Sequence, residues 1–444
     1  MEQTDAAERQ RGEGLRLSRR MTVKEVSMET IISESYHILI DCLKKDGPGV
    51  EPSLLSGIST ERWDALLALA AMQRVRPLFW HRLRQKGLND AVPIKAAEKL
   101  RDVSRLNTLR NLRLYAELRS LLSALRSEGI PLILLKGIYM ADAVYANMGL
   151  REMNDIDVLA RPADLARITG ILTGMGYRPV QTVSADTIIQ VQHHLPPMVK
   201  KGHASFEIHW NLTPPGTYYS IDPDELWERA APVHIAGCDA LALSPEDLLL
   251  HLCMHTSYHH QFAFGLRPSC DIAETITRFG LVLNWQTITE RAYRWVWQRG
   301  VYLALRLARE LAGADVPEEI LERLLPADMT GAVLETARAQ VLTDKRLAAS
   351  IPAPFAELLE SRRLWDKIRI FWQRVFLPRA LISTLYSVPM DSIRIYGCYP
   401  RRFIDVLRRH GHTLKKYRQN DAPLKTLAER TSRIAEWLAG PEIH

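Results

Sequence analysis

The sequence has few cysteines and lacks any long apolar run. Its five cysteines are far apart, without the paired spacing of metal motifs, and their odd number argues against a disulfide framework. No apolar stretch approaches the roughly eighteen residues that a membrane span requires, and the N-terminus has no apolar signal core. These absences predict a cytoplasmic protein with reduced cysteines and no integral membrane segment.

Charge is unevenly distributed along the 444 residues. The whole chain has a net charge of +7, but residues 361–444 contain seventeen Lys and Arg against seven Asp and Glu. Such a basic region can attract RNA, a nucleotide-sugar or an anionic membrane face. A solvated helical appendage is the simpler interpretation, and no recognisable nucleic-acid module accompanies the region.

Three acidic residues on two short predicted strands form the most informative pattern. Asp155 and Asp157 lie in Asn154–Ala160, and Glu207 lies in Ser205–Trp210. Successive side chains of a strand alternate between its faces, so Asp155 and Asp157 project together. Two carboxylates placed in this way can share a divalent metal ion.

A turn suited to phosphate binding precedes the acidic strands. The apolar run Ile130–Leu135 predicts a buried strand, which Lys136 and Gly137 close before a helical stretch at Ile138–Ala146. Gly137 allows a backbone to approach a phosphate, and Lys136 and Arg151 supply positive charge beside a helix N-terminus. The order predicts a phosphate-holding turn beside a metal-holding strand.

Each of these residues also has a simpler interpretation. Paired Asp residues after an Asn can cap a turn, and Glu207 with His209 can form the polar face of an amphipathic strand. Lys136 can be an ordinary lysine at a strand end, and Arg151 can pair with Glu152 or a nearby Asp. The order in which the motifs follow one another favours the site.

The order of these motifs resembles a known family. It comprises Leu134-Leu-Lys-Gly137, Arg151, Asn154-Asp-Ile-Asp-Val-Leu159, Gly176-Tyr177 and Phe206-Glu-Ile-His-Trp210. This succession resembles the uncharacterised bacterial nucleotidyltransferase family of the polymerase-beta-like superfamily, over roughly residues 35 to 345. The resemblance implies a small mixed sheet flanked by helices, and magnesium-dependent transfer of a nucleoside monophosphate from a nucleoside triphosphate (NTP).

The resemblance also implies roles for individual residues. Asp155 and Asp157 match the paired metal ligands, Glu207 matches the third carboxylate, and Gly137 matches the glycine of the phosphate-facing turn. The expected metal is Mg²⁺, with Mn²⁺ as an alternative. The chain departs from the pattern at Ile138, where a second Gly or Ser is usual.

Four residues are expected to bind the nucleotide around these carboxylates: Lys136, Gly137, Arg151 and His209. Lys136 and Arg151 would clamp the phosphates or orient the carboxylates. Glu207 would bind the acceptor-side metal or deprotonate the acceptor.

A second pattern consists of histidines. His251, His255 and His259 recur every four residues, which places them on one face of a helix that persists. The segment lacks the Glu of a His-Glu-x-x-His motif, and three successive turns span too far for one tetrahedral zinc ion. Structural packing is therefore the simpler interpretation, with a contact to the nucleotide pocket or to Asp271 as a modest alternative.

The predicted fold class is α+β, with a small mixed β-sheet core flanked by N-terminal helices and a C-terminal helical region. We expect a disordered leader at 1–24, a nucleotidyltransferase domain with N-terminal helices at 25–244, a helical domain at 245–346 and a basic helical region at 347–444. Leucines from Leu100 to Leu125 predict one long amphipathic helix that Gly129 ends.

The predicted function is transfer of a nucleoside monophosphate to an unidentified acceptor: a small molecule, a peptide, a polysaccharide precursor or RNA. One alternative is a catalytically silent module that binds a nucleotide or a partner, which Ile138 favours slightly. A further alternative is a toxin-like enzyme that modifies RNA, for which the basic C-terminal region is the support.

Overall fold

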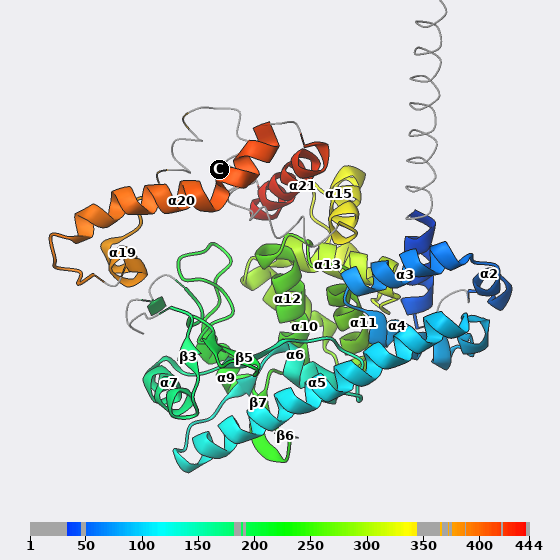
Figure 1. Ribbon diagram of the computed structural model, residues 1–444, viewed down its shortest axis with the longest axis horizontal. Coiled ribbons are helices and arrows are strands. Elements are labelled where there is room, and N and C mark those ends of the chain that lie inside the picture. Colours follow the sequence, from blue (N-terminus) through cyan, green and yellow to red (C-terminus); the bar gives the residue numbers. More distant parts are fainter. Residues whose placement is uncertain are drawn as a thin grey trace, which may run out of the picture.

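The structure is a computed structural model that describes residues 33–45, 50–181, 188–189, 192–343, 365, 372, 375–386, 388–418 and 421–440. Within these residues, helices surround one mixed sheet, so the α+β prediction is confirmed (Figure 1). The predicted leader at 1–24 lies outside the described residues. Among the residues that are described, no helix is both long and apolar enough to cross a membrane.

Helices precede the sheet in the sequence, as predicted. After the short α2, helices α3 and α4 lead into α5, which has 34 residues and runs along one side of the molecule (Figure 1). Gly129, with a left-handed φ of +66°, follows its end. The bounds are Pro52–Ser56 for α2, Thr60–Met72 for α3, Arg76–Gln85 for α4 and Ile94–Ser127 for α5.

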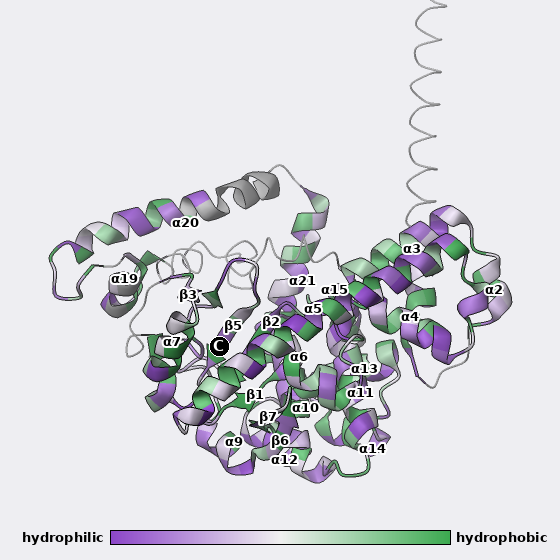
Figure 2. Cartoon of the chain, turned by 60° about the horizontal axis from the view of Figure 1, so that its bottom comes forward, coloured by the Kyte–Doolittle hydropathy of each residue, from purple (hydrophilic) through white to green (hydrophobic). Residues whose placement is uncertain are grey.

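The predicted leucine stripe of α5 is wrong in its middle. Leu100 and Leu118 are buried, but Leu106 is 64% exposed and Leu109 is 55% exposed. Asn107 and Asn111 take the inward positions instead, at the seven- and four-residue spacing that continues the buried face. Hydrophilic and hydrophobic residues alternate visibly along α5 in Figure 2. The pattern of apolar residues therefore predicted the wrong buried face in the middle of α5, where the inward side chains donate to backbone carbonyls.

In the part of the chain that the structure describes, seven strands form one sheet in the order β3-β4-β5-β2-β1-β7-β6. Strand β1 pairs parallel with β7 and antiparallel with β2, and β2 pairs parallel with β5, which confirms a mixed sheet. The bounds are Ile133–Leu134 for β1, Asp155–Leu159 for β2, Arg178–Pro179 for β3, Met198–Val199 for β4, Ser205–His209 for β5, Ala231–Ile235 for β6 and Cys238–Ala242 for β7.

The segments between β1 and β3 agree with the predicted elements. Helix α6, Lys136–Tyr139, follows β1 directly and continues as a π-helical turn, Met140–Val144. Helix α7, Leu165–Gly174, follows β2 after a short 3₁₀ turn. The Lys136-Gly137 turn therefore lies at the end of a central strand.

A second group of helices comes from the C-terminal half of the chain. Helix α10 ends in another π-helical turn, His255–His259, and π-helical turns occur frequently at functional sites. The bounds are Pro223–Arg229 for α9, Pro245–Met254 for α10, Arg267–Phe279 for α11, Trp285–Arg294 for α12, Gln298–Ala312 for α13, Glu318–Leu324 for α14 and Gly331–Val341 for α15. One hydrophobic core joins these helices to the sheet and to the N-terminal helices.

The last described helices are α19, α20 and α21. Helix α21 packs on α15, where Gln340 Nε2 donates to Thr431 Oγ1 at 2.9 Å. Helix α20 extends beside α19 away from the sheet (Figure 1). The bounds are Arg379–Tyr386 for α19, Ile395–Arg418 for α20 and Ala422–Ala439 for α21. The predicted division of the chain into domains stays a prediction.

Candidate metal and nucleotide site

The register between two parallel strands brings two of the predicted carboxylates together. Asp157 of β2 pairs with Glu207 of β5, and Leu159 pairs with His209. Paired residues of neighbouring strands point to the same face, and His209 lies two residues after Glu207 on that face. Ligand atoms of Asp157, Glu207 and His209 all lie within 4.8 Å of one another.

The three side chains form a compact and largely buried group. His209 Nε2 lies 3.3 Å from an oxygen of Asp157 and 3.9 Å from an oxygen of Glu207. Asp157 and His209 are each 5% exposed, whereas the Glu207 side chain is 30% exposed. The group therefore opens towards solvent at Glu207.

The two carboxylates have opposite pKa shifts. Burial raises the pKa of Asp157, but Lys136 and the hydrogen bond with His209 outweigh burial and hold it well below its ordinary range. Burial and the neighbouring negative charges of Asp157 and Asp155 raise the pKa of Glu207 to about 7. Burial lowers the pKa of His209 to about 4, so its imidazole is neutral at pH 7.

Asp155 lies at the edge of this group rather than inside it. It is on the same face of β2 as Asp157 and opposite Ser205, and it is partly exposed. Its charge contributes to the raised pKa of Glu207. Its carboxylate is not one of the three ligand groups that converge within 4.8 Å.

Lys136 reaches the carboxylates from the turn after β1. Its Nζ lies 3.4 Å from Asp157 Oδ1 and 3.2 Å from His255 Nε2. Its backbone has a positive φ of 37°, an uncommon conformation for a residue with a side chain. Such strained residues are enriched at functional sites. The expected role of Lys136 at the phosphates or the carboxylates stays a prediction.

Arg151 is placed differently from a phosphate clamp. Its Nε and Nη2 donate to the two carboxylate oxygens of Asp271 at 2.9 and 2.8 Å, and both side chains are buried. Tyr145 Oη donates to the same carboxylate at 2.8 Å. A Cβ at position 137 would lie only 2.8 Å from Arg151 Nη1. Gly137 is therefore required because Arg151 packs against its backbone.

Two asparagines of α5 hold the segment that leads to Arg151, and the sequence analysis missed them. Asn107 Nδ2 donates to the carbonyls of Gly149 and Arg151 at 2.8 and 3.2 Å. Asn111 Nδ2 donates to the Arg151 carbonyl at 2.9 Å and to that of Met148. The sequence did contain a signal for them: two asparagines four residues apart, at positions that continue the buried face of the long helix from Leu100.

Arg267, at the start of α11, was also missed. Its Nη1 donates to the Glu152 carbonyl at 2.8 Å, and among the described residues no carboxylate forms an ion pair with it. Burial and then the positive charge of Arg151 lower its pKa to about 10, while the negative charges of Asp271 and then Asp155 act in the opposite direction. Arg267 is thus a cation whose charge is poorly compensated beside the acidic strand.

Half of the fourteen histidines gather beside the three ligand groups: His193, His194, His209, His251, His255, His259 and His260. The centroid of the His193 ring lies 5.5 Å from that of the His209 ring and 5.1 Å from that of the His259 ring. We call these seven residues the histidine cluster. They come from the loop before β4, from β5 and from the end of α10.

The histidine cluster is electrically neutral where shifts are resolved. Burial and Lys136 hold the pKa values of His251 and His255 well below their ordinary value, and burial lowers that of His259 to about 3. In the described part of the chain, no other three His, Cys, Asp or Glu residues converge as Asp157, Glu207 and His209 do.

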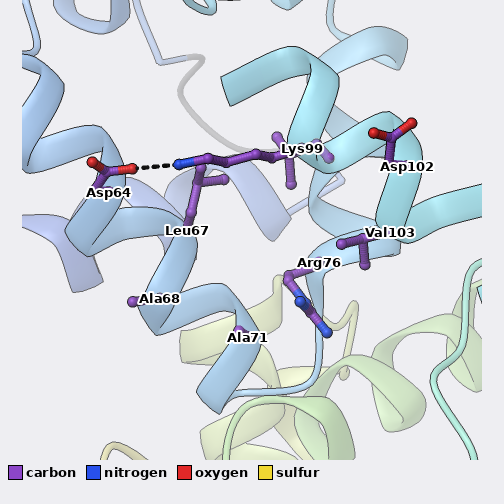
Figure 3. Close-up of a pocket in the computed structure, with 9 residues that line it drawn as sticks. Asp64, Leu67, Ala68, Ala71, Arg76, Lys99, Asp102 and Val103 are labelled. Atoms are coloured by element: carbon purple, nitrogen blue, oxygen red, sulfur yellow. Dashed lines mark hydrogen bonds and ion pairs between the residues drawn. The ribbon is translucent and has the colours of Figure 1, made fainter. Parts of the chain in front are cut away.

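A separate cavity of about 500 Å³ lies between α3 and α5 (Figure 3). Lys99 donates to Asp64 across its mouth at 2.8 Å, and Arg76 is on its wall. Arg76 Nε lies 3.6 Å from Glu152, the neighbour of Arg151. None of the predicted site residues lines this cavity.

One of three comparisons with known proteins finds a match. The model of a family described as an uncharacterised nucleotidyltransferase matches residues 59–313, more than half of the chain. No curated protein and no solved structure matches the chain. The matched segment contains the Lys136-Gly137 turn, both acidic strands and the histidine cluster. The chain therefore belongs to this family of uncharacterised nucleotidyltransferases, which supports nucleotidyl transfer as its general activity.

Proposed function

We propose that the protein is a metal-dependent nucleotidyltransferase of the polymerase-beta-like superfamily, which moves a nucleoside monophosphate from an NTP to an acceptor. The observation that carries the proposal is the convergence of Asp157, Glu207 and Lys136 beside the Gly137 turn. The acceptor stays the predicted small molecule, peptide, polysaccharide precursor or RNA.

The side chains present fit a divalent metal ion. Asp157 and Glu207 supply carboxylate oxygens within 4.8 Å of each other, and Asp155 stands beside them on the same face. The depressed pKa of Asp157 keeps it ionised, as a ligand must be. A metal bound there would neutralise charge on the transferred phosphate and lower the pKa of an attacking hydroxyl.

Two cations of the chain are available for the phosphates. Lys136 would contact them from the turn while its Nζ stays close to Asp157, 3.4 Å away. Arg267 would take the phosphate role first expected of Arg151, because it donates to the Glu152 carbonyl at 2.8 Å, three residues before Asp155, and has no paired carboxylate among the described residues. Arg151 would act as a positioning residue, since its Nε and Nη2 both donate to Asp271.

Glu207 is suited to the acceptor side of the reaction. It is the most exposed of the three converging side chains, and its pKa of about 7 matches a group that exchanges a proton near neutral pH. Glu207 would either hold an acceptor-side metal or take the proton of the attacking hydroxyl.

A catalytically silent binding module is the second candidate, and Ile138 favours it. The Ile138 side chain is fully buried, and its carbonyl accepts a hydrogen bond from Tyr115 Oη at 2.7 Å. Position 138 therefore offers the triphosphate neither a hydroxyl nor a mobile glycine backbone. The intact acidic triplet Asp155, Asp157 and Glu207 opposes this candidate.

Incubation of the full chain with labelled NTPs, divalent metal and a cell lysate tests the proposal. We expect a labelled small molecule, peptide or RNA that forms only when metal is present. We expect Asp157→Asn to reduce its formation by at least about 100-fold, because even residues behind a metal ligand commonly affect activity 10–100-fold. The same assay applies to Asp155→Asn.

Undiminished metal-dependent transfer by both Asp variants would remove the assignment of the site. Metal-dependent NTP binding without any labelled product across lysates would instead select the silent module. Arg267→Gln should weaken NTP binding while metal binding without nucleotide is retained, which separates the phosphate role from the metal role.

A further inference from the structure

The ligand set contains one group that differs chemically from the other two. Asp157 and Glu207 offer oxygen, whereas His209 offers a nitrogen within the same 4.8 Å group. Mg²⁺ prefers oxygen ligands in near-octahedral geometry, while first-row transition ions readily accept imidazole. The identity of the third ligand therefore bears on which metal the site selects.

We propose that His209 is a direct metal ligand and that it makes this site select Mn²⁺ over Mg²⁺. This inference rests on the proposed metal-dependent function. It names the ion and adds a nitrogen ligand to the carboxylates.

The positions of the donor atoms support direct ligation. Neighbouring ligands of an octahedral ion with bonds of about 2.1 Å lie about 3 Å apart. His209 Nε2 lies 3.3 Å from Asp157 Oδ1 and 3.9 Å from Glu207 Oε2, so small side-chain movements suffice. It is the Nε2 atom, at the tip of the ring, that faces both carboxylates.

Strand geometry fixes this orientation. Residues Glu207 and His209 are two positions apart on β5, and the parallel register places His209 opposite Leu159, one pleat from Asp157. The His209 side chain is 6% exposed, and its ring lies 5.5 Å from that of His193 and 5.2 Å from that of His194, measured between centroids. Packing therefore holds the imidazole against the carboxylates.

Mn²⁺ is the transition ion that fits two carboxylates, one imidazole and substrate oxygens. Carboxylate and water ligands suit Mg²⁺ and Mn²⁺ alike. An imidazole nitrogen departs from the all-oxygen shell that Mg²⁺ prefers, so its presence disfavours Mg²⁺ relative to Mn²⁺. Zinc sites usually take more nitrogen or sulfur ligands.

Metal binding to the full chain without nucleotide tests the inference. Free Mn²⁺ is measured by electron paramagnetic resonance, and Mg²⁺ affinity is measured by competition. We expect wild type to bind Mn²⁺ at least about tenfold more tightly than Mg²⁺. His209→Asp makes the ligand set all-oxygen and should remove this preference, and His209→Asn should weaken Mn²⁺ binding more than Mg²⁺ binding.

A spectroscopic readout separates ligation from packing. Electron spin echo modulation of bound Mn²⁺ should show coupling to an imidazole nitrogen in wild type and none in His209→Asp. His260→Asn is the matched control, because it changes a histidine of the same cluster outside the three ligand groups, and it should keep both the preference and the coupling. Melting curves by circular dichroism check that each variant is folded.

The outcomes distinguish this inference from the function on which it rests. Equal affinities of wild type for both ions, or a nitrogen coupling retained in His209→Asp, would overturn the role of His209 alone. The metal site itself would be overturned if wild type bound neither Mn²⁺ nor Mg²⁺, or if Asp157→Asn left their binding intact.

Discussion

Two buried pairs of a cation and a carboxylate lie close to the Gly137 turn, and they differ in how fully their groups are satisfied. Arg151 donates two hydrogen bonds to Asp271, whose carboxylate also accepts from Tyr145. Lys136 approaches Asp157 at 3.4 Å, and Asp157 shares the same oxygen with His209. The first pair is closed, whereas the second remains available to a ligand.

The difference separates scaffold from site. A bidentate arginine pair with a third hydrogen bond has little capacity left for a substrate. A carboxylate beside two further ligand groups, with an ammonium at its edge, has unused oxygen lone pairs. Both pairs are buried, so burial of charge alone would not have distinguished them.

Removal of one partner from the closed pair should have the larger effect on stability. We expect Asp271→Asn to lower the free energy of unfolding by about 3–5 kcal/mol, because Arg151 would remain buried without its counter-charge. Asp157→Asn should cost less than half of that. Lys136 retains His255 as a partner, and repulsion between Asp157 and Glu207 disappears. Denaturant unfolding of both variants measures the difference.

The double variant Arg151→Met with Asp271→Leu sharpens this comparison. Replacement of both charges by apolar groups should recover most of the stability that Asp271→Asn loses. Equal destabilisation by Asp157→Asn and Asp271→Asn would contradict the division into scaffold and site.

Crowding of the Gly137 turn should have the next largest effect. We expect Gly137→Ala to destabilise the fold by about 1–3 kcal/mol, because its Cβ would come within 2.8 Å of Arg151 Nη1. Nucleotidyl transfer should fall as well, since Lys136 is in the same turn. Thermal unfolding and the labelled-NTP assay measure the two effects.

Gly170→Ala is the matched control for this substitution. Gly170 lies inside α7, and no atom lies within 4 Å of an added Cβ. Alanine there should stabilise the helix by about 0.5–1 kcal/mol. A Gly137→Ala variant that behaves like Gly170→Ala would exclude the close approach of Arg151 as the reason for glycine.

The open pair should also make the protein sensitive to pH near neutrality. Because the pKa of Glu207 is raised to about 7, metal affinity should rise between pH 6 and 8 as Glu207 loses its proton. Without metal, the folded state binds this proton more tightly than the unfolded state, so the contribution of Glu207 to stability declines as pH rises from about 4.5 to 7.

Glu207→Gln tests this assignment. It should flatten the increase in metal affinity across pH 6 to 8 and remove the corresponding decline in the stability of the metal-free protein. Titrations of metal binding and unfolding at several pH values measure both. An unchanged pH profile in this variant would assign the titration to another group.

Much of the fold was predictable from local patterns. The apolar run before Lys136 and the strand that holds Asp155 and Asp157 are found where periodicity and turn residues placed them. The middle of α5 was not predictable in this way. There Asn107 and Asn111 face inward to bind backbone carbonyls of a distant segment, and Leu106 and Leu109 face solvent.

The site was predictable in part. Order and residue type singled out Asp157 and Glu207, and the register of β2 with β5 brings them together. The partner of Arg151 could not be determined, because Asp271 lies 120 residues away on helix α11. Nor does the sequence indicate that Arg267 donates to the Glu152 carbonyl and has no carboxylate partner among the described residues.

The sequence by itself determined which side chains share a face of each strand, because alternation is a local property of an extended backbone. It also determined that a glycine follows Lys136. Only the tertiary structure decided which charges are neutralised: Arg151 by Asp271, and Asp157 by a loose contact with Lys136 among histidines. The reason is that electrostatic energy depends on distance and burial in space, which packing between remote segments sets.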